Sequence, residues 1–108
     1  MKDYRLKMQW QYEYDKEGTW FSNAEGEESY PLCAGNEFPL PHIDVKNLEI
    51  RSVIAEGDTV TAEVYVDHAV YTVRSGEPPV TAHASHNYSV CGDSVWESMV
   101  LTLTIEEA

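Results

Sequence analysis

The chain is poor in basic residues and contains no long hydrophobic run. Seven Lys and Arg side chains stand against 19 Asp and Glu in 108 residues, for a formal net charge of −12. A chain this acidic repels nucleic-acid phosphates and anionic membranes, so we expect neither as a direct partner. No apolar stretch approaches the roughly 20 residues of a membrane helix, and the first residues lack the apolar core of a signal peptide. We therefore expect a cytoplasmic protein.

Cysteine and the common catalytic motifs are also scarce. The two cysteines, Cys33 and Cys91, form no CxxC pair and no metal-ligand spacing, and their spacing does not decide whether they are bonded to each other. Phosphate-binding glycine loops, GxSxG and HExxH are missing as well. The sequence therefore favours a role without catalysis, and no cofactor, catalytic residue or metal ligand is predicted.

What the sequence does contain is alternation with a period of two. Between residues 3 and 14 the even positions are aromatic or aliphatic and the odd positions are polar or charged. This pattern predicts a strand with one buried face. Residues 15–47 are rich in glycine, proline and glutamate, and we predict a long irregular crossing there, with one short strand near Thr19–Ser22.

From Asn47 onward the alternation returns, and turn residues divide it. Turns at Glu56-Gly57-Asp58, at Ser75–Pro79 and at Gly92-Asp93 predict a four-stranded antiparallel meander. Its strands span residues 47–55, 59–74, 80–91 and 94–106. In this register Ala84 lies beside Leu101, so a small residue meets a large one on the buried face. With residues 3–14 closing it, the meander predicts a single all-β domain over residues 1–108, either a small antiparallel β-barrel or a two-layer β-sandwich.

Three ionisable residues fall on the apolar side of this predicted sheet: His68, His86 and Glu97. The second turn places His68 opposite His86, and the third places Glu97 next to Tyr88. Two imidazoles and a carboxylate are a set that binds a small ligand, transfers protons or holds a divalent metal. They equally form a structural cluster that satisfies its own hydrogen bonds, which is the interpretation we favour. His68, His86, Tyr88 and Glu97 are the candidate ligand-binding residues.

The other side of the predicted sheet carries aromatic residues. Tyr65 and Trp96 fall in one cross-strand row, and Glu25, Glu27 and Glu28 form an acidic stretch in the predicted crossing. Exposed aromatic side chains and concentrated charge are features that protein interfaces use. These five residues are the candidate interaction surface.

The uneven charge indicates the function that we favour from sequence. Residues 17–108 carry 16 acids and three bases, a net charge of −13, and such a field steers basic partners toward the chain. We predict a non-enzymatic acidic β module that binds a protein partner, in the limiting case an inhibitor that mimics nucleic acid on a basic, nucleic-acid-binding surface. Two alternatives stay open: a small-molecule-binding barrel or enzyme built on the His/His/Glu site, and a structural subunit that assembles through strand edges. The oligomeric state is left open.

Overall fold

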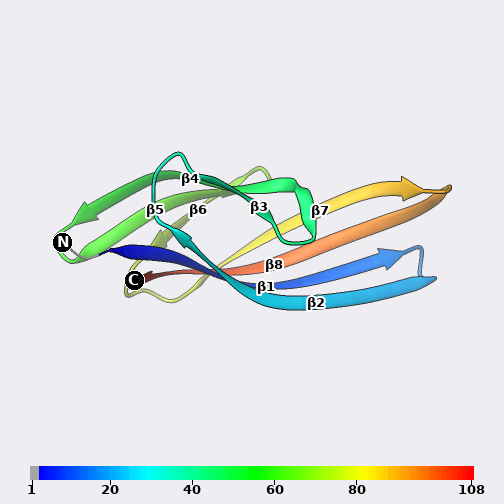
Figure 1. Ribbon diagram of the computed structural model, residues 1–108, viewed down its shortest axis with the longest axis horizontal. Coiled ribbons are helices and arrows are strands. Elements are labelled where there is room, and N and C mark those ends of the chain that lie inside the picture. Colours follow the sequence, from blue (N-terminus) through cyan, green and yellow to red (C-terminus); the bar gives the residue numbers. More distant parts are fainter. Residues whose placement is uncertain (1–2) are drawn as a thin grey trace.

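The computed structural model describes residues 3–108, which form two four-stranded antiparallel sheets (Figure 1). Sheet A has the strand order β2-β1-β8-β7. Its strands are β1 (Tyr4–Lys16), β2 (Trp20–Pro31), β7 (Val80–Val90) and β8 (Asp93–Glu107). Sheet B has the order β3-β4-β5-β6. Its strands are β3 (Glu37–Leu40), β4 (Ile43–Glu56), β5 (Thr59–Val66) and β6 (Ala69–Arg74).

The two sheets pack face to face over part of their length, and one hydrophobic core lies between them. In β1 the predicted alternation is confirmed, because Leu6, Met8, Trp10 and Tyr12 are buried while the residues between them are half-buried or exposed. Sheet B contributes the facing side chains of Leu48, Ile50, Val60, Ala62, Val64 and Val66. The all-β prediction is confirmed, and residues 3–108 form two layers rather than a closed barrel. None of them forms a helix long and apolar enough to cross a membrane.

The prediction of an irregular crossing over residues 15–47 is wrong. Most of this segment lies in strands, namely β2, β3, the end of β1 and the start of β4. β2 pairs with β1 from Arg5–Pro31 to Lys16–Trp20. β2 lies at an edge of sheet A and most of its side chains are exposed, so backbone pairing holds the strand without an alternating sequence. Gly26, which suggested a break, instead leaves room for a core ring, because a Cβ atom there would lie 2.5 Å from Cζ2 of Trp10.

The predicted strand over residues 59–74 is also wrong, because a tight turn divides it. Asp67 and His68 both have positive φ values, 45° and 74°, which two-residue hairpin turns require. The Asp67 carboxylate fixes the turn: it accepts hydrogen bonds from Nζ of Lys46 at 2.7 Å and from the backbone N–H of Ser85 at 2.9 Å. As a result β6 and β7 lie in different sheets, and the predicted four-stranded meander does not form.

The last hairpin is confirmed, but its register differs from the prediction by two residues. The turn consists of Cys91 and Gly92 rather than Gly92 and Asp93, since Val90 pairs with Asp93. Ala84 therefore lies opposite Met99 instead of Leu101. A shift of two residues preserves the side of the sheet that each residue faces, so all three of these side chains are buried as predicted.

Sheet A extends well beyond sheet B, which gives the molecule its elongated shape of 54 × 21 × 17 Å. At the end remote from the termini, β1, β2, β7 and β8 continue without a second layer above them (Figure 1). The hydrophobic core extends along sheet A only as far as Tyr12, Ala84 and Met99. We call residues 13–23 and 86–97, which lie past this limit, the projecting end.

Replacing Leu101 by alanine should destabilise the fold by about 2–5 kcal/mol, because its side chain is fully buried between the sheets. Urea unfolding followed by circular dichroism measures the change. The matched control is Val100→Ala, one residue away on the outer face and 38% exposed, which should cost under about 1 kcal/mol. Equal midpoints for the two variants would contradict the assignment of faces.

Replacing Gly26 by alanine should cost about 1–3 kcal/mol, because the added methyl group collides with the ring of Trp10. A double-mutant cycle isolates this clash. In a Trp10→Leu background the smaller side chain leaves space, and the cost of Gly26→Ala should fall. The same cost in both backgrounds would show that the Trp10 ring is not the reason for the glycine.

Candidate functional site

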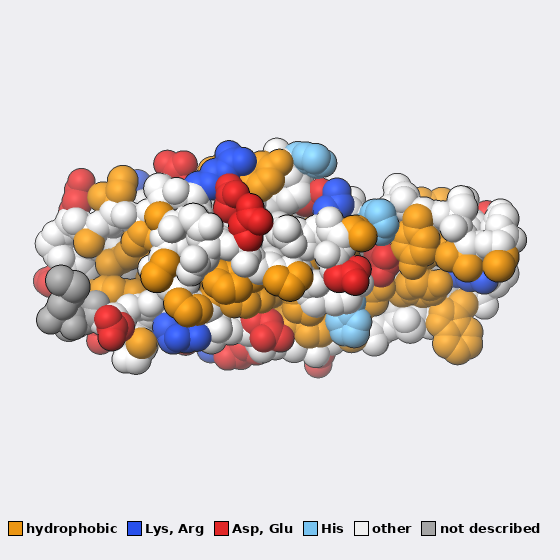
Figure 2. All heavy atoms as spheres, turned by 45° about the horizontal axis from the view of Figure 1, so that its top comes forward, with side chains coloured by type: hydrophobic (Ala, Val, Ile, Leu, Met, Phe, Trp, Pro, Cys, Tyr) orange, Lys and Arg blue, Asp and Glu red, His pale blue; other side chains and the backbone are white. Residues whose placement is uncertain are grey.

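The projecting end concentrates the exposed apolar side chains of the protein. Five large apolar side chains are exposed there: Trp20 (64% exposed), Phe21 (58%), Trp96 (47%), Val90 and Tyr88. In Figure 2, large hydrophobic side chains are visible at this end of the molecule, in addition to those along the rest of its length. Strand register puts Phe21 and Trp96 on either side of Asp15 on the outer face, and Trp20 and Val95 on either side of Lys16 on the inner face. The projecting end therefore exposes aromatic side chains on both of its faces.

On the inner face, a row of polar residues crosses all four strands just past the core. Strand pairing places Ser22, Tyr14, Glu97 and His86 next to one another in that order. The preceding row toward the core consists of Ala24, Tyr12, Met99 and Ala84. The boundary between the covered core and the projecting end thus falls between these two rows.

Among residues 3–108, Glu97 is the one charged residue that is buried. Only 8% of its surface is exposed. The Tyr12 hydroxyl donates a hydrogen bond to Oε2 of Glu97, and the Tyr88 hydroxyl interacts with the same carboxylate and with Tyr14. Within residues 3–108, no Lys, Arg or His forms an ion pair with Glu97. Within the part of the chain that the structure describes, the contacts of this carboxylate are therefore with tyrosine hydroxyls.

These contacts extend the pH range over which the tyrosines stay protonated. Burial, and next the hydrogen bond to Glu97, raise the pKa of Tyr12 far above its ordinary value of 10. Burial, and next the charge of Glu97, also raise the pKa of Tyr88. Both hydroxyls therefore remain donors to the carboxylate beyond the pH at which a free tyrosine ionises.

A hollow of about 260 Å³ opens beside Glu97. Its walls come from the β3–β4 turn on one side and from β7 and β8 on the other: His42, Ile43, Asp44, Val45, His86, Tyr88 and Glu97. The His42 ring stacks on Tyr12 with ring centroids 4.8 Å apart, and the His86 ring stacks on Tyr88 at 5.1 Å. The hollow therefore combines a buried carboxylate with one ring of the first pair, His42, and both rings of the second.

The structure brings together three of the four predicted ligand-binding residues. His86 lies directly opposite Glu97 across β7 and β8, and Tyr88 lines the same hollow. His68 does not join them, because the turn at residues 67–68 puts its side chain at a hairpin tip, 83% exposed. Its Nδ1 lies 3.4 Å from the Tyr65 hydroxyl instead.

Sequence reasoning missed the parts of this cluster that other elements supply. Tyr12 and Tyr14 follow the same alternation as the core residues of β1, but nothing in the sequence shows that β1 runs beside β8. His42 lies in a proline-flanked turn with a φ of 64°, and no local pattern indicates that it stacks on Tyr12. Pairing of β1 with β8 brings the two tyrosines to Glu97, and the packing of sheet B on sheet A brings His42 there.

The predicted interaction residues do not form one surface. Tyr65 lies on the outside of sheet B, where it pairs with Glu49 and the guanidinium of Arg51 covers its ring at 4.0 Å. Trp96 lies on the outside of sheet A, paired with Asn87. The prediction that Tyr65 and Trp96 share one cross-strand row is wrong, because the two residues belong to different sheets.

The acidic stretch lies apart from both aromatic residues. Glu25, Glu27 and Glu28 are exposed along β2, the edge strand of sheet A, and Glu27 pairs with Lys7 at 3.3 Å. An exposed row of acids at a sheet edge discourages pairing with another strand and adds to the negative field of this side of the molecule.

Metal binding and a disulfide find no support in the geometry. Among residues 3–108, no three His, Cys, Asp or Glu side chains are grouped as a metal site requires. Both cysteines are free and exposed. Cys91 lies in the turn at the tip of the projecting end, and Cys33 lines a cavity at the opposite end.

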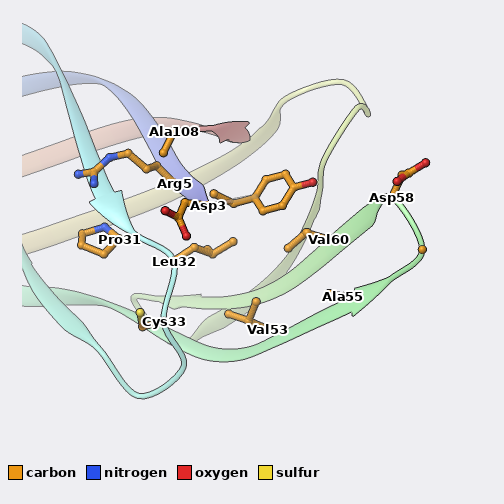
Figure 3. Close-up of a pocket in the computed structure, with 12 residues that line it drawn as sticks. Asp3, Arg5, Pro31, Leu32, Cys33, Val53, Ala55, Asp58, Val60 and Ala108 are labelled. Atoms are coloured by element: carbon orange, nitrogen blue, oxygen red, sulfur yellow. The ribbon is translucent and has the colours of Figure 1, made fainter. Parts of the chain in front are cut away.

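That second cavity, of about 670 Å³, opens between the sheets near the termini (Figure 3). Leu32, Val53 and Val60 give it largely apolar walls, and Asp3 and Arg5 also line it. None of the residues predicted to bind a ligand or a partner lies there. The predicted residues that the structure does bring together are all at the projecting end.

The raised pKa of Tyr12 predicts alkaline sensitivity. Above pH 10 the unfolded chain releases the Tyr12 proton while the folded chain retains it, so stability falls as the pH rises. Between pH 10 and about 11.5, the free energy of unfolding should fall less steeply for Tyr12→Phe than for the wild type. Chemical denaturation at several pH values measures both slopes, and identical slopes would contradict the assigned environment.

Comparisons of this chain with protein-family models, with curated proteins and with solved structures find no match. A proposal for its function therefore has to be based on the geometry of the projecting end and on the charge of the chain.

Proposed function

We propose that this chain is a non-enzymatic, acidic β module that binds a basic protein partner through the projecting end of sheet A. The observation that carries the proposal is the exposure of aromatic side chains on a sheet segment that no second layer covers. Trp20, Phe21 and Trp96 are each about half exposed or more.

Aromatic exposure of this kind favours a protein as the occupant. Trp and Tyr are the side chains most enriched among the residues that dominate binding energy at protein interfaces. They supply large rigid contact area at a low cost in conformational entropy. Several large apolar side chains exposed near one another are typical of an interaction site.

Charge at the same place favours a basic partner over a second copy of the chain. Residues 13–23 and 86–97 contain five acids and one base. The base, Lys16, lies 3.6 Å from a carboxylate oxygen of Asp93, so part of its charge is already compensated. Two such ends repel each other, whereas a surface rich in Lys and Arg is attracted to this one.

The test compares two double variants that each lose two exposed apolar side chains. Trp20→Ser/Trp96→Ser removes side chains from the projecting end, and Ile54→Ser/Val70→Ser removes exposed side chains from the outside of sheet B. Each protein is immobilised through Cys33 in a Cys91→Ser background, so that the projecting end faces solution. Proteins captured from the native host are quantified by mass spectrometry, and binding of the purified partner is then measured directly.

We expect a basic partner that the wild type and the sheet B variant bind and that the Trp20/Trp96 variant does not. Equal binding by all three proteins would refute the proposed surface, and an acidic partner would refute the proposed charge complementarity. Concentration-dependent dimers of the wild type in light scattering would identify a second copy as the occupant. If the partner's basic surface binds nucleic acid, a short DNA duplex should compete with the chain for it.

Salt dependence provides a further prediction. The association rate with the partner should fall markedly between low and physiological ionic strength, where the screening length shortens to about 8 Å. Reversing the charges of Glu25, Glu27 and Glu28 should slow association more than it changes dissociation. Stopped-flow or surface-binding kinetics separate the two rates, and indifference to both changes would leave the acidic surface as a solubility feature only.

A further inference from the structure

We infer that the hollow beside Glu97 is a subsite for the guanidinium group of an arginine side chain. The inference rests on the proposed function, since it names the group of the basic partner that this part of the projecting end would hold. It depends on the buried carboxylate and its aromatic surroundings rather than on the exposed tryptophans.

The charge of Glu97 supports this assignment. An ionised carboxylate accepts about four hydrogen bonds, and a buried one is costly unless it is well satisfied. Tyr12 supplies one donor and Tyr88 interacts with the same group, but no cation within residues 3–108 pairs with it. The site therefore has unused acceptor capacity and an uncompensated negative charge next to an opening to solvent.

The lining of the hollow is partly aromatic. His42, His86 and Tyr88 line it. Each of them belongs to a pair of rings that is close to parallel, with interplanar angles of 20° for Tyr12 and His42 and 27° for His86 and Tyr88. Aromatic rings beside a carboxylate suit a flat cation, because guanidinium stacks on aromatic rings while its edges donate to a carboxylate. The chain itself contains this combination elsewhere, where Arg51 covers Tyr65 and donates to Glu49 at 2.8 Å.

Arginine suits this hollow better than lysine does. An ammonium group is compact and strongly hydrated, and it donates as a point charge. A guanidinium is planar, weakly hydrated and presents a fork of N–H groups that fits a carboxylate edge. The second acidic residue in the lining, Asp44, is exposed and adds attraction for either cation. The aromatic lining of the hollow therefore favours guanidinium over ammonium.

The probe for this inference is N-acetyl-arginine N-methylamide, titrated into the ¹⁵N-labelled protein and followed by NMR. The matched neutral probe is the citrulline analogue, and the matched ammonium probe is the lysine analogue. We expect shifts that saturate with the arginine probe and map to the backbone amides around His42, His86 and Glu97. The lysine probe should bind more weakly, and the citrulline probe should produce no saturable shift.

Glu97→Gln tests the carboxylate itself. Glutamine keeps the shape and an acceptor for Tyr12 but loses the charge, so the affinity for the arginine probe should fall at least about tenfold. Glu63→Gln removes the same charge from the exposed outside of sheet B and should leave the affinity unchanged. Tyr88→Leu, at an exposed position, tests the aromatic wall and should also weaken binding.

Several outcomes overturn the inference. Equal losses in Glu97→Gln and Glu63→Gln would reduce it to a general effect of net charge, and equal binding of the arginine and lysine probes would refute the guanidinium preference. A thermal unfolding curve for Glu97→Gln shows whether this variant is folded. If it is not folded, Tyr88→Leu serves as the test variant in its place. Failure of the probe together with partner binding that still requires Trp20 and Trp96 would refute this subsite and leave the proposed function standing.

Discussion

The structure depends on the pairing of β1 with β8, which runs without a register shift from Tyr4–Glu107 to Lys16–Val95. At about 3.3 Å per residue, the 15 residues of β8 span roughly 50 Å. In sheet B only β4, with 14 residues, approaches that length, and the eight residues of β5 span roughly 26 Å. Most of sheet B is therefore too short to cover sheet A along its whole length. One part of the inner face of sheet A becomes a core, and the remainder stays open as the projecting end.

The residues on the inner face change character where this cover ends. Met99 and Ala84 are packed under sheet B, and the next residues toward the tip on the same face are Glu97 and His86. A buried carboxylate is tolerated at this boundary because the Tyr12 hydroxyl satisfies it from the core side and Tyr88 interacts with it from the projecting end, while the hollow gives it access to solvent. The same position makes it available to a partner's cation, which links the proposed arginine subsite to the aromatic surface around it.

The candidate site was predictable only where it depended on one hairpin. His86, Tyr88 and Glu97 lie together because β7 and β8 are joined by a short turn, and an error of two residues in the register did not change their faces. His68 was misplaced because Asp67 and His68 adopt positive φ values that local sequence does not demand. The contacts of Asp67 with Lys46 and Ser85, which are remote in sequence, help fix that turn.

The sequence by itself determined the strand class, the buried faces of β1 and the β7–β8 hairpin, and the acidic charge, because alternation, tight turns and composition are local properties. Tertiary structure alone decided that residues 20–31 form a strand, since backbone pairing with β1 holds it and its side chains carry no pattern. It also decided which strands share a sheet, and it brought His42 onto Tyr12 beside Glu97. These features depend on contacts between segments that are remote in sequence. No local sequence pattern indicates how strong such contacts are.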